Sequence, residues 1–95
     1  MTTFPDAVGP VLEPSELGLA VLSAIQSLNE GVSVQDRGSY LRVHAARRCV
    51  VTRQAIEAAL GRPVKLPGDL ELAMPSFRGT LKIDAELAVW EAQAP

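Results

Sequence analysis

Residues 36–61 read D-R-G-S-Y-L-R-V-H-A-A-R-R-C-V-V-T-R-Q-A-I-E-A-A-L-G. The first four of these residues have the composition of a turn. Two apolar runs follow, Tyr40–Val43 and Cys49–Val51, and a short polar loop that contains Arg47 and Arg48 separates them. Two strand-like runs at this spacing predict an antiparallel hairpin.

Two helices are predicted from their start and stop signals. Ser15 is an N-cap residue, and apolar side chains follow it at helical spacing as far as Leu28. Gly31 is the expected left-handed residue after this helix. The second helix starts after the cap residue Thr52 and ends at Gly61.

The remaining strands are predicted from shorter patterns. The first contains a proline and is therefore expected at a sheet edge, and the second alternates and is expected to be half-buried. The last remains open between strand and short helix. In chain order these segments are Val8–Leu12, Val32–Gln35, Leu70–Met74, Thr80–Asp84 and Glu86–Trp90. The order β-α-β-β-α-β-β predicts a single-domain α+β sandwich, with both helices packed on one face of a mainly antiparallel sheet.

Length and composition indicate one soluble domain. The chain has 95 residues, of which 47% are hydrophobic, so one core can form, expected over residues 8–90 with short tails at 1–7 and 91–95. The formal net charge is −2, which gives nucleic acid and anionic membranes no general attraction. Six of the nine basic residues lie between Arg37 and Arg62. Because the sequence has neither a membrane-length apolar run nor a leader pattern, a cytoplasmic location is expected.

Cysteine and histidine counts argue against a metal centre. The one cysteine, Cys49, excludes an internal disulfide and a multi-thiolate site, and a buried position in a strand is expected for it. A thiol activated by the neighbouring arginines is the alternative. His44 is the only histidine, and its neighbours in the strand are not metal ligands. We therefore expect a solvated strand histidine and neither metal nor cofactor.

The sequence also contains no motif of a hydrolytic active site. Ser39 and Ser76 do not lie in a nucleophile elbow. Asp84 and Glu86 are close enough for acid–base work, but a position at the end of a strand on an acidic surface is the simpler reading. The chain is thus interpreted as a binding module without catalytic residues.

Two kinds of stand-alone binding module remain as alternatives. One is a small-molecule sensor that holds its ligand between helices and sheet. The other is an RNA-binding module, for which a basic and aromatic face is available. Its residues are Arg37, Tyr40, Arg42, Arg47 and Arg48. Only four aromatic residues are present in the chain, which weakens this second alternative.

An ordered series of segments resembles a known family. The segments are D-R-G-S-Y-L-R-V at 36–43, C-V-V-T-R-Q-A-I-E-A-A-L-G-R-P at 49–63 and L-P-G-D-L-E-L-A-M-P-S-F-R-G at 66–79. Together they resemble the small effector (coupling) proteins of soluble diiron monooxygenases, which serve methane, phenol, toluene and alkene oxidation. V-G-P-V at 8–11 and Asn29 are similar to the toluene and alkene branch.

The resemblance implies a regulatory component without activity or cofactor of its own. Such a protein binds the diiron hydroxylase above its active site and tunes turnover, coupling and regioselectivity of hydrocarbon or aromatic oxidation. It also affects electron delivery from the ferredoxin or reductase. The short N-terminal tail differs from that of the methane-oxidising members, so a role carried by a long tail is not implied here.

Contacts with the hydroxylase are expected at two segments, the turn and strand from residue 36 and the segment from residue 73 to 79. The residues expected to bind the partner are Asp36, Arg37, Tyr40, Arg42, Met74, Ser76, Phe77 and Gly79. Structural roles are the alternative for some of them. Gly38 and Gly79 would permit turns, and Phe77 would belong to the core. Thr52 and Gly61 are assigned to helix capping.

Overall fold

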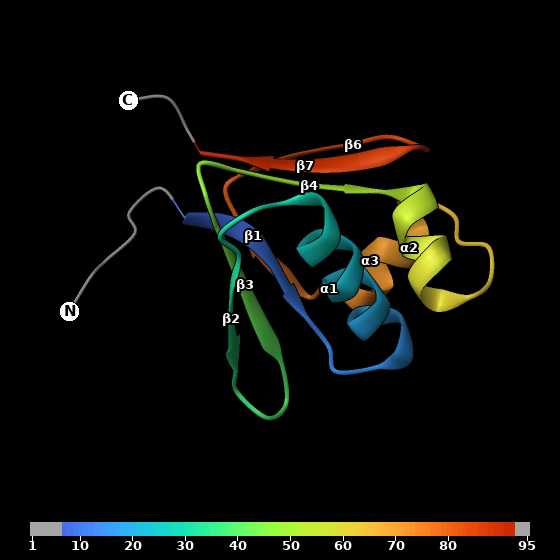
Figure 1. Ribbon diagram of the computed structural model, residues 1–95, viewed down its shortest axis with the longest axis horizontal. Coiled ribbons are helices and arrows are strands. Elements are labelled where there is room, and N and C mark those ends of the chain that lie inside the picture. The colour runs from blue at the N-terminus through green and yellow to red at the C-terminus, as the bar shows by residue number, and fades with distance from the viewer. Residues whose placement is uncertain (1–6, 93–95) are drawn as a thin grey trace.

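The computed structural model describes residues 7–92 and contains seven strands and three helices (Figure 1). The strands form two sheets, ordered β2-β3-β1-β5 and β4-β7-β6, and every strand pairing is antiparallel. The predicted α+β class is confirmed, with two sheets in place of one. The elements are β1 Ala7–Leu12, α1 Glu16–Leu28, β2 Ser33–Asp36, β3 Leu41–Ala46, β4 Arg48–Thr52, α2 Arg53–Leu60, α3 Gly68–Ala73, β5 Ser76–Arg78, β6 Thr80–Ile83 and β7 Leu87–Glu91.

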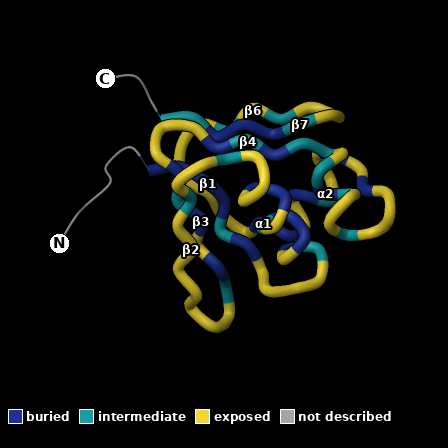
Figure 2. The backbone as a smooth tube through the Cα atoms, in the orientation of Figure 1, coloured by how far each residue is buried: buried dark blue, intermediate teal, exposed yellow. Residues whose placement is uncertain are grey.

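The helices lie in the angle between the two sheets (Figure 1). Helix α1 packs against α2 and also contacts β1 and β4, so it joins both sheets to one core. Figure 2 shows buried residues along β1, α1 and β7. The largest fully buried side chains come from these elements and from α2 and α3. They are Trp90, Leu12, Ile25, Ile56 and Leu70.

Both main helices begin and end as predicted. Ser15 Oγ accepts a hydrogen bond of 3.0 Å from the Gly18 backbone N–H, and Thr52 Oγ1 accepts one of 3.1 Å from Ala55. Gly61 ends α2 in the left-handed region with a φ of 83°. The tails expected at residues 1–7 and 91–95 lie mostly outside the described residues, but Ala7 begins β1 and Glu91 ends β7.

The predicted hairpin between Tyr40–Val43 and Cys49–Val51 is wrong. Strand β3 pairs with β1 and β2, whereas β4 pairs with β7 in the other sheet. The single residue between β3 and β4, Arg47, has a φ of 70°, a value uncommon for a residue other than glycine. The chain therefore turns a corner from one sheet into the other at Arg47, and each strand finds its partner far away in the sequence.

The first two strands also differ from expectation. Strand β1 lies between β3 and β5, not at an edge. Its proline is accommodated because the pairing with β3 is interrupted at Gly9 and Pro10, so the missing N–H of Pro10 breaks no ladder bond to β3. Strand β2 is exposed along its whole length and not half-buried, because it pairs only with β3 at the edge of the sheet.

The segment Leu70–Met74 belongs to helix α3 and not to a strand. Leu70 and Ala73 are buried, whereas Leu72 is 75% exposed. A strand would place Leu70 and Leu72 on the same face, so the burial follows the helical period and not the strand period. The open choice at residues 86–90 is settled as strand β7.

Candidate partner-binding site

The turn between β2 and β3 positions two of the predicted contact residues. The Asp36 carboxylate accepts a hydrogen bond of 2.8 Å from the Gly38 N–H, and Gly38 has a φ of 82°. The Arg37 N–H donates to the Tyr40 carbonyl at 2.9 Å. These two bonds fix the turn and leave the side chain of Arg37 exposed at its tip.

Pairing across β1 brings the two predicted contact segments together. Val11 on β1 pairs with Arg42 on one side and with Ser76 on the other. Residues directly opposite each other on antiparallel strands have their side chains on the same face of the sheet. Three predicted contact residues, Tyr40, Arg42 and Ser76, consequently line one open groove of about 490 Å³. The other lining residues are Val11, Glu13, Pro14, Ser39 and Pro75.

The other residues of the second segment have different surroundings. Phe77 on β5 is 41% exposed, so it is not a core residue. Met74 is buried, with 7% of its surface exposed, and packs in the core. Gly79 forms the second corner at which the chain leaves one sheet for the other, and its φ is 99°. A Cβ at Gly79 would lie 2.7 Å from Val8 Cγ1 and 2.8 Å from the Glu91 carbonyl oxygen.

Replacing Gly79 by alanine is expected to destabilise the fold, because the new Cβ overlaps its neighbours and the backbone conformation is unfavourable for alanine. We expect a loss of about 2–4 kcal/mol in the free energy of unfolding, measured by urea denaturation. Gly38→Ala is the matched control, since Gly38 has a similar φ and no atom within 4 Å of the new Cβ. It should cost only about 1 kcal/mol. Equal losses in the two variants would contradict a packing role for Gly79.

The outer face of the four-stranded sheet carries a group of basic residues. Arg42 and His44 point outward from β3, because their neighbours Leu41, Val43 and Ala45 are buried. Arg78 on β5 pairs with Gly9 and lies on the same face. Partial burial lowers the pKa of His44, and the positive charges of Arg42 and Arg78 lower it further. At neutral pH the imidazole is therefore uncharged and the two arginines carry the charge of this face.

Residues considered for catalysis are held in structural roles. Cys49 is fully buried, and burial raises the pKa of its thiol to about 12, so it stays protonated and unreactive. Asp84 accepts hydrogen bonds from the backbone N–H groups of Glu86 and Leu87, which lower the pKa of its carboxyl group. Glu86 forms a 3.0 Å ion pair with Arg53. The described residues contain no group of three side chains that could hold a metal ion.

Sequence reasoning missed the role of Asn29. Its Nδ2 donates to the carbonyls of Ile25 and Val50, each at 2.8 Å, and its Oδ1 accepts a hydrogen bond of 3.0 Å from the Val50 N–H. One side chain thus ends α1 and binds the free edge of β4. The asparagine directly after the last apolar residue of the helix was the only available signal.

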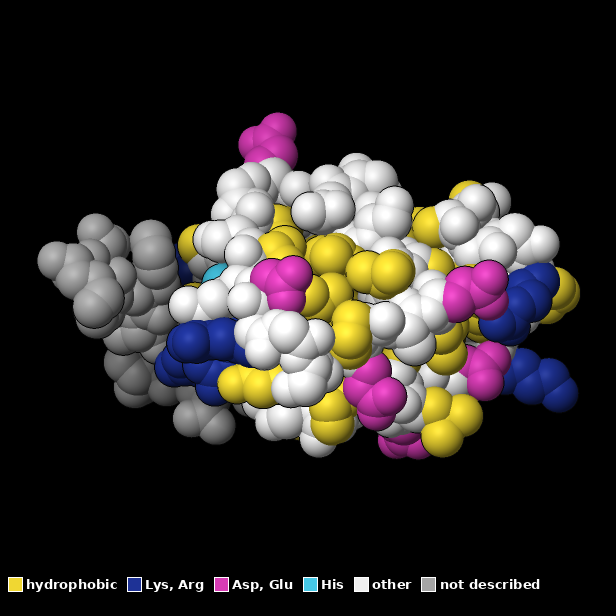
Figure 3. All heavy atoms as spheres, turned by 90° about the horizontal axis from the view of Figure 1, so that it is seen from below, with side chains coloured by type: hydrophobic (Ala, Val, Ile, Leu, Met, Phe, Trp, Pro, Cys, Tyr) yellow, Lys and Arg dark blue, Asp and Glu magenta, His cyan; other side chains and the backbone are white. Residues whose placement is uncertain are grey.

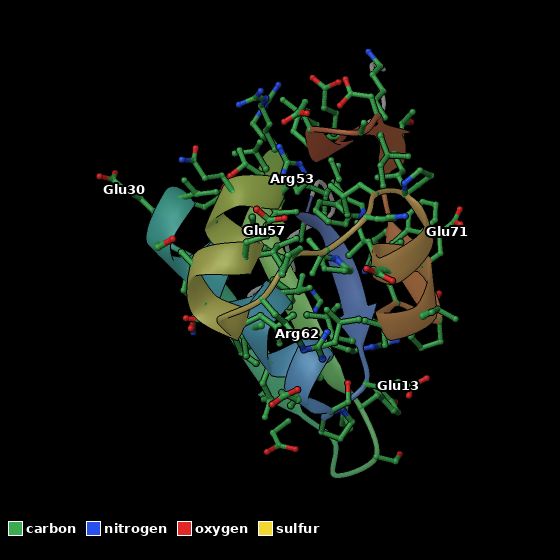
Figure 4. All side chains as sticks on the ribbon, turned by 90° about the vertical axis from the view of Figure 1, so that its right-hand side faces the viewer. Glu13, Glu30, Arg53, Glu57, Arg62 and Glu71 are labelled. Carbon is green, nitrogen blue, oxygen red and sulfur yellow. The ribbon has the colours of Figure 1, made fainter. Side chains whose placement is uncertain are left out.

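Sequence reasoning also missed an ion-pair network at α2. Arg53 and Glu57 lie next to each other on this helix (Figure 4), with 3.1 Å between Nη1 and Oε2. Glu57 also accepts a hydrogen bond from the Val64 N–H at 3.0 Å, and this bond is the main cause of the lowered pKa of its carboxyl group. The network ties the loop after α2 to the helix, and Glu86 joins it from the turn before β7.

Comparison with known proteins identifies the family. Residues 6–91 match the model of the MmoB/DmpM family. The chain belongs to the MmoB/DmpM family. Within it, the chain is 43% identical over 76 residues to the effector subunit of the alkene monooxygenase system of Xanthobacter autotrophicus (strain ATCC BAA-1158 / Py2). That match covers 78% of this chain and 74% of the relative.

Solved structures share this MmoB/DmpM fold. A chain of the phenol hydroxylase–regulatory protein complex superimposes with a TM-score of 0.81 at 19% identity, covering 93% of this chain and 99% of its own. Regulatory protein B of soluble methane monooxygenase superimposes with a TM-score of 0.70 at 20% identity, covering 98% of this chain and 69% of its own. The resemblance to effector proteins that the sequence indicated is thereby confirmed at the level of family and fold.

Proposed function

We propose that this protein is a regulatory effector subunit of a multicomponent monooxygenase, and that it binds the diiron hydroxylase component. The observation that carries the proposal is membership of the MmoB/DmpM family, with an alkene monooxygenase effector subunit among the relatives. Two side chains that were considered for catalysis have structural roles. The Cys49 thiol is buried, and the Asp84 carboxylate accepts the hydrogen bonds that hold a turn. The protein acts on the rate and selectivity of its partner and carries no cofactor.

The physical mechanism is differential affinity. An effector that binds one hydroxylase conformation more tightly than another shifts the population toward the first, and a tenfold difference in affinity corresponds to about 1.4 kcal/mol. Through this shift the effector changes substrate and oxygen access and the delivery of electrons from ferredoxin or reductase. The described residues include no helix long and apolar enough to span a membrane. We place the complex in the cytoplasm.

The binding surface in this proposal is the outer face of the four-stranded sheet together with the β2–β3 turn. The expected contacts that remain exposed or partly exposed there are Asp36, Arg37, Tyr40, Arg42 and Ser76. Phe77 is exposed as well, but it pairs with Pro10 and therefore lies on the opposite face of the sheet from Ser76. Met74 and Gly79 support this surface from within, through the core and the corner described above. An interface of ordinary size, about 800 Å² on each partner, fits a protein whose extents are 39 × 29 × 22 Å.

The test is a titration of this protein into the hydroxylase and electron-transfer components of the same organism. Turnover rate and product distribution are measured at each ratio. We expect a saturable change in both, and no turnover by this protein alone. If rate and product distribution stay constant across the titration while both partners are folded, the proposed function is wrong.

A further inference from the structure

Two arginines and a histidine surround a position without a side chain. Val8 pairs with Ala45 and Val11 with Arg42, so Gly9 lies opposite His44 on the outer face of the sheet. On its other side Gly9 pairs with Arg78. Gly9 itself is buried, whereas the side chains of Arg42 and Arg78 on either side of it are exposed. A Cβ at Gly9 would approach the Val43 carbonyl oxygen to 2.5 Å, so the position tolerates no larger residue.

The positive charges on this face lack partners in the described part of the chain. Neither Arg42 nor Arg78 forms an ion pair with another described residue. Arg53, Arg62 and Lys82, by contrast, form ion pairs with Glu57, Glu16 and Glu91. A local excess of positive charge on a protein of net charge −2 is complementary to an acidic surface of a partner. Figure 3 shows basic side chains at the same end of the molecule as the single histidine.

The adjoining groove indicates what kind of ligand this face takes. Arg42 lies at its border, and apolar side chains of Val11, Pro14 and Pro75 line it. Glu13 is also part of the lining, and its carboxylate would repel a small free anion. A peptide segment avoids this conflict, because its backbone N–H groups can face Glu13 while an acidic side chain faces the arginines. The groove therefore favours a polypeptide over a small anion.

We propose that the outer face of the four-stranded sheet binds an acidic segment of the hydroxylase. A carboxylate of that segment lies between the exposed side chains of Arg42 and Arg78, and a neighbouring apolar side chain enters the groove beside Pro14 and Pro75. This inference rests on the proposed function and specifies its interface. Ser39 and Ser76, at the groove walls, offer hydroxyl groups to the bound backbone.

Charge reversal tests the role of the two arginines. Arg42→Glu and Arg78→Glu are each expected to weaken hydroxylase binding at least about tenfold, because each places a negative charge next to the bound carboxylate. Binding is measured by calorimetry between about 0.05 and about 0.3 M NaCl, and the wild-type affinity should fall more steeply with salt than that of either variant. Circular dichroism confirms that the variants fold.

Lys65→Glu is the matched control. It makes the same change in net charge in the exposed loop between α2 and α3, at the end of the molecule opposite to the four-stranded sheet (Figure 1). We expect it to change affinity less than about threefold, within the usual effect of an exposed charge. If wild type binds and all three variants weaken binding equally, the inference is wrong while the proposed function stands. If wild type itself does not bind, the proposed function fails.

Cross-linking identifies the segment that is bound. The buried Cys49 does not react, so Ser76→Cys provides a single accessible thiol for a photoactivatable cross-linker. We expect the linked hydroxylase peptide to contain aspartate or glutamate close to the attachment point, whereas Ser27→Cys on α1 should give no specific product. A linked peptide without acidic residues would overturn the inference. Saturable binding of inorganic phosphate to wild type that Arg42→Glu abolishes would overturn it as well, by showing a site for small anions.

Discussion

Replacing Trp90 by alanine is expected to cost about 3–5 kcal/mol in the free energy of unfolding. Trp90 is fully buried, and it pairs with Cys49 and Leu81 in the middle of the three-stranded sheet. A domain of this size has a total stability of about 5–15 kcal/mol, so the variant should be largely unfolded at moderate urea concentrations. Urea denaturation followed by far-ultraviolet circular dichroism measures the loss.

Trp90→Phe separates volume from hydrogen bonding. The indole Nε1 is buried, and no described group accepts its hydrogen. Phenylalanine keeps most of the apolar volume and removes an unpaired polar group, so we expect a loss below about 2 kcal/mol. A loss as large as that of Trp90→Ala would mean that the indole N–H of Trp90 makes a hydrogen bond that stabilises the fold.

Replacing Asn29 by alanine is the second change with a large expected effect, a loss of about 2–4 kcal/mol. The amide makes three hydrogen bonds to backbone groups, and two of them satisfy both polar groups of Val50 on the free edge of β4. Alanine leaves these partly buried groups without a partner, at about 1–3 kcal/mol for each unsatisfied group that water does not reach. Thermal and urea unfolding both report the change.

Asn29→Asp is the isosteric control for this hydrogen-bond pattern. The carboxylate still accepts from the Val50 N–H, but it faces the carbonyls of Ile25 and Val50 where the amide donated. We expect the variant to be at least as unstable as Asn29→Ala at neutral pH, and to regain stability in acid, where a protonated carboxyl donates one hydrogen bond. Wild-type stability for Asn29→Asp at neutral pH would show that donation by the amide is unimportant.

Local features of the fold were predictable from the sequence because local chemistry determines them. Ser15 and Thr52 cap their helices through hydrogen bonds to residues three positions ahead, so both partners of each bond lie within one short stretch of sequence. The turn after Asp36 and the strand beginning at Thr80 are likewise governed by neighbours in sequence. The helical spacing of α3 is present in the sequence, since Leu70 and Ala73 are three residues apart. The segment Leu70–Met74 is only five residues long, however, and its alternation of apolar and polar residues favoured a strand.

Pairing between distant segments was not predictable from local pattern. The hairpin prediction failed because β3 and β4 are joined by one residue, Arg47, whose backbone conformation sends the chain into another sheet. The interior position of β1 depends on β5, more than sixty residues later, and on an interruption of pairing at Pro10. The hydrophobic pattern of a single strand indicates neither the corner at Arg47 nor the interior position of β1.

The candidate site also depends on pairing between distant segments, which the sequence did not show. Arg42 and Ser76 were selected by resemblance, and only the pairing of both with Val11 shows that they share one face. Gly79 was selected for the same reason, yet its surroundings explain it by packing. Arg78 escaped notice because its importance comes from Gly9, which lies opposite on a strand distant in sequence.

Strand β7 has a consequence for the order in which the molecule forms. Among the described strands it alone pairs with β4 and β6. Its Glu91 carbonyl approaches the corner at Gly79, and the Ala92 N–H that follows donates to the Arg47 carbonyl at the other corner. The three-stranded sheet therefore cannot form before residues 87–92 are available. A chain emerging from the ribosome cannot complete its second sheet until synthesis has passed this point, so folding should be a late, all-or-none event that exposes β4 to chaperones beforehand.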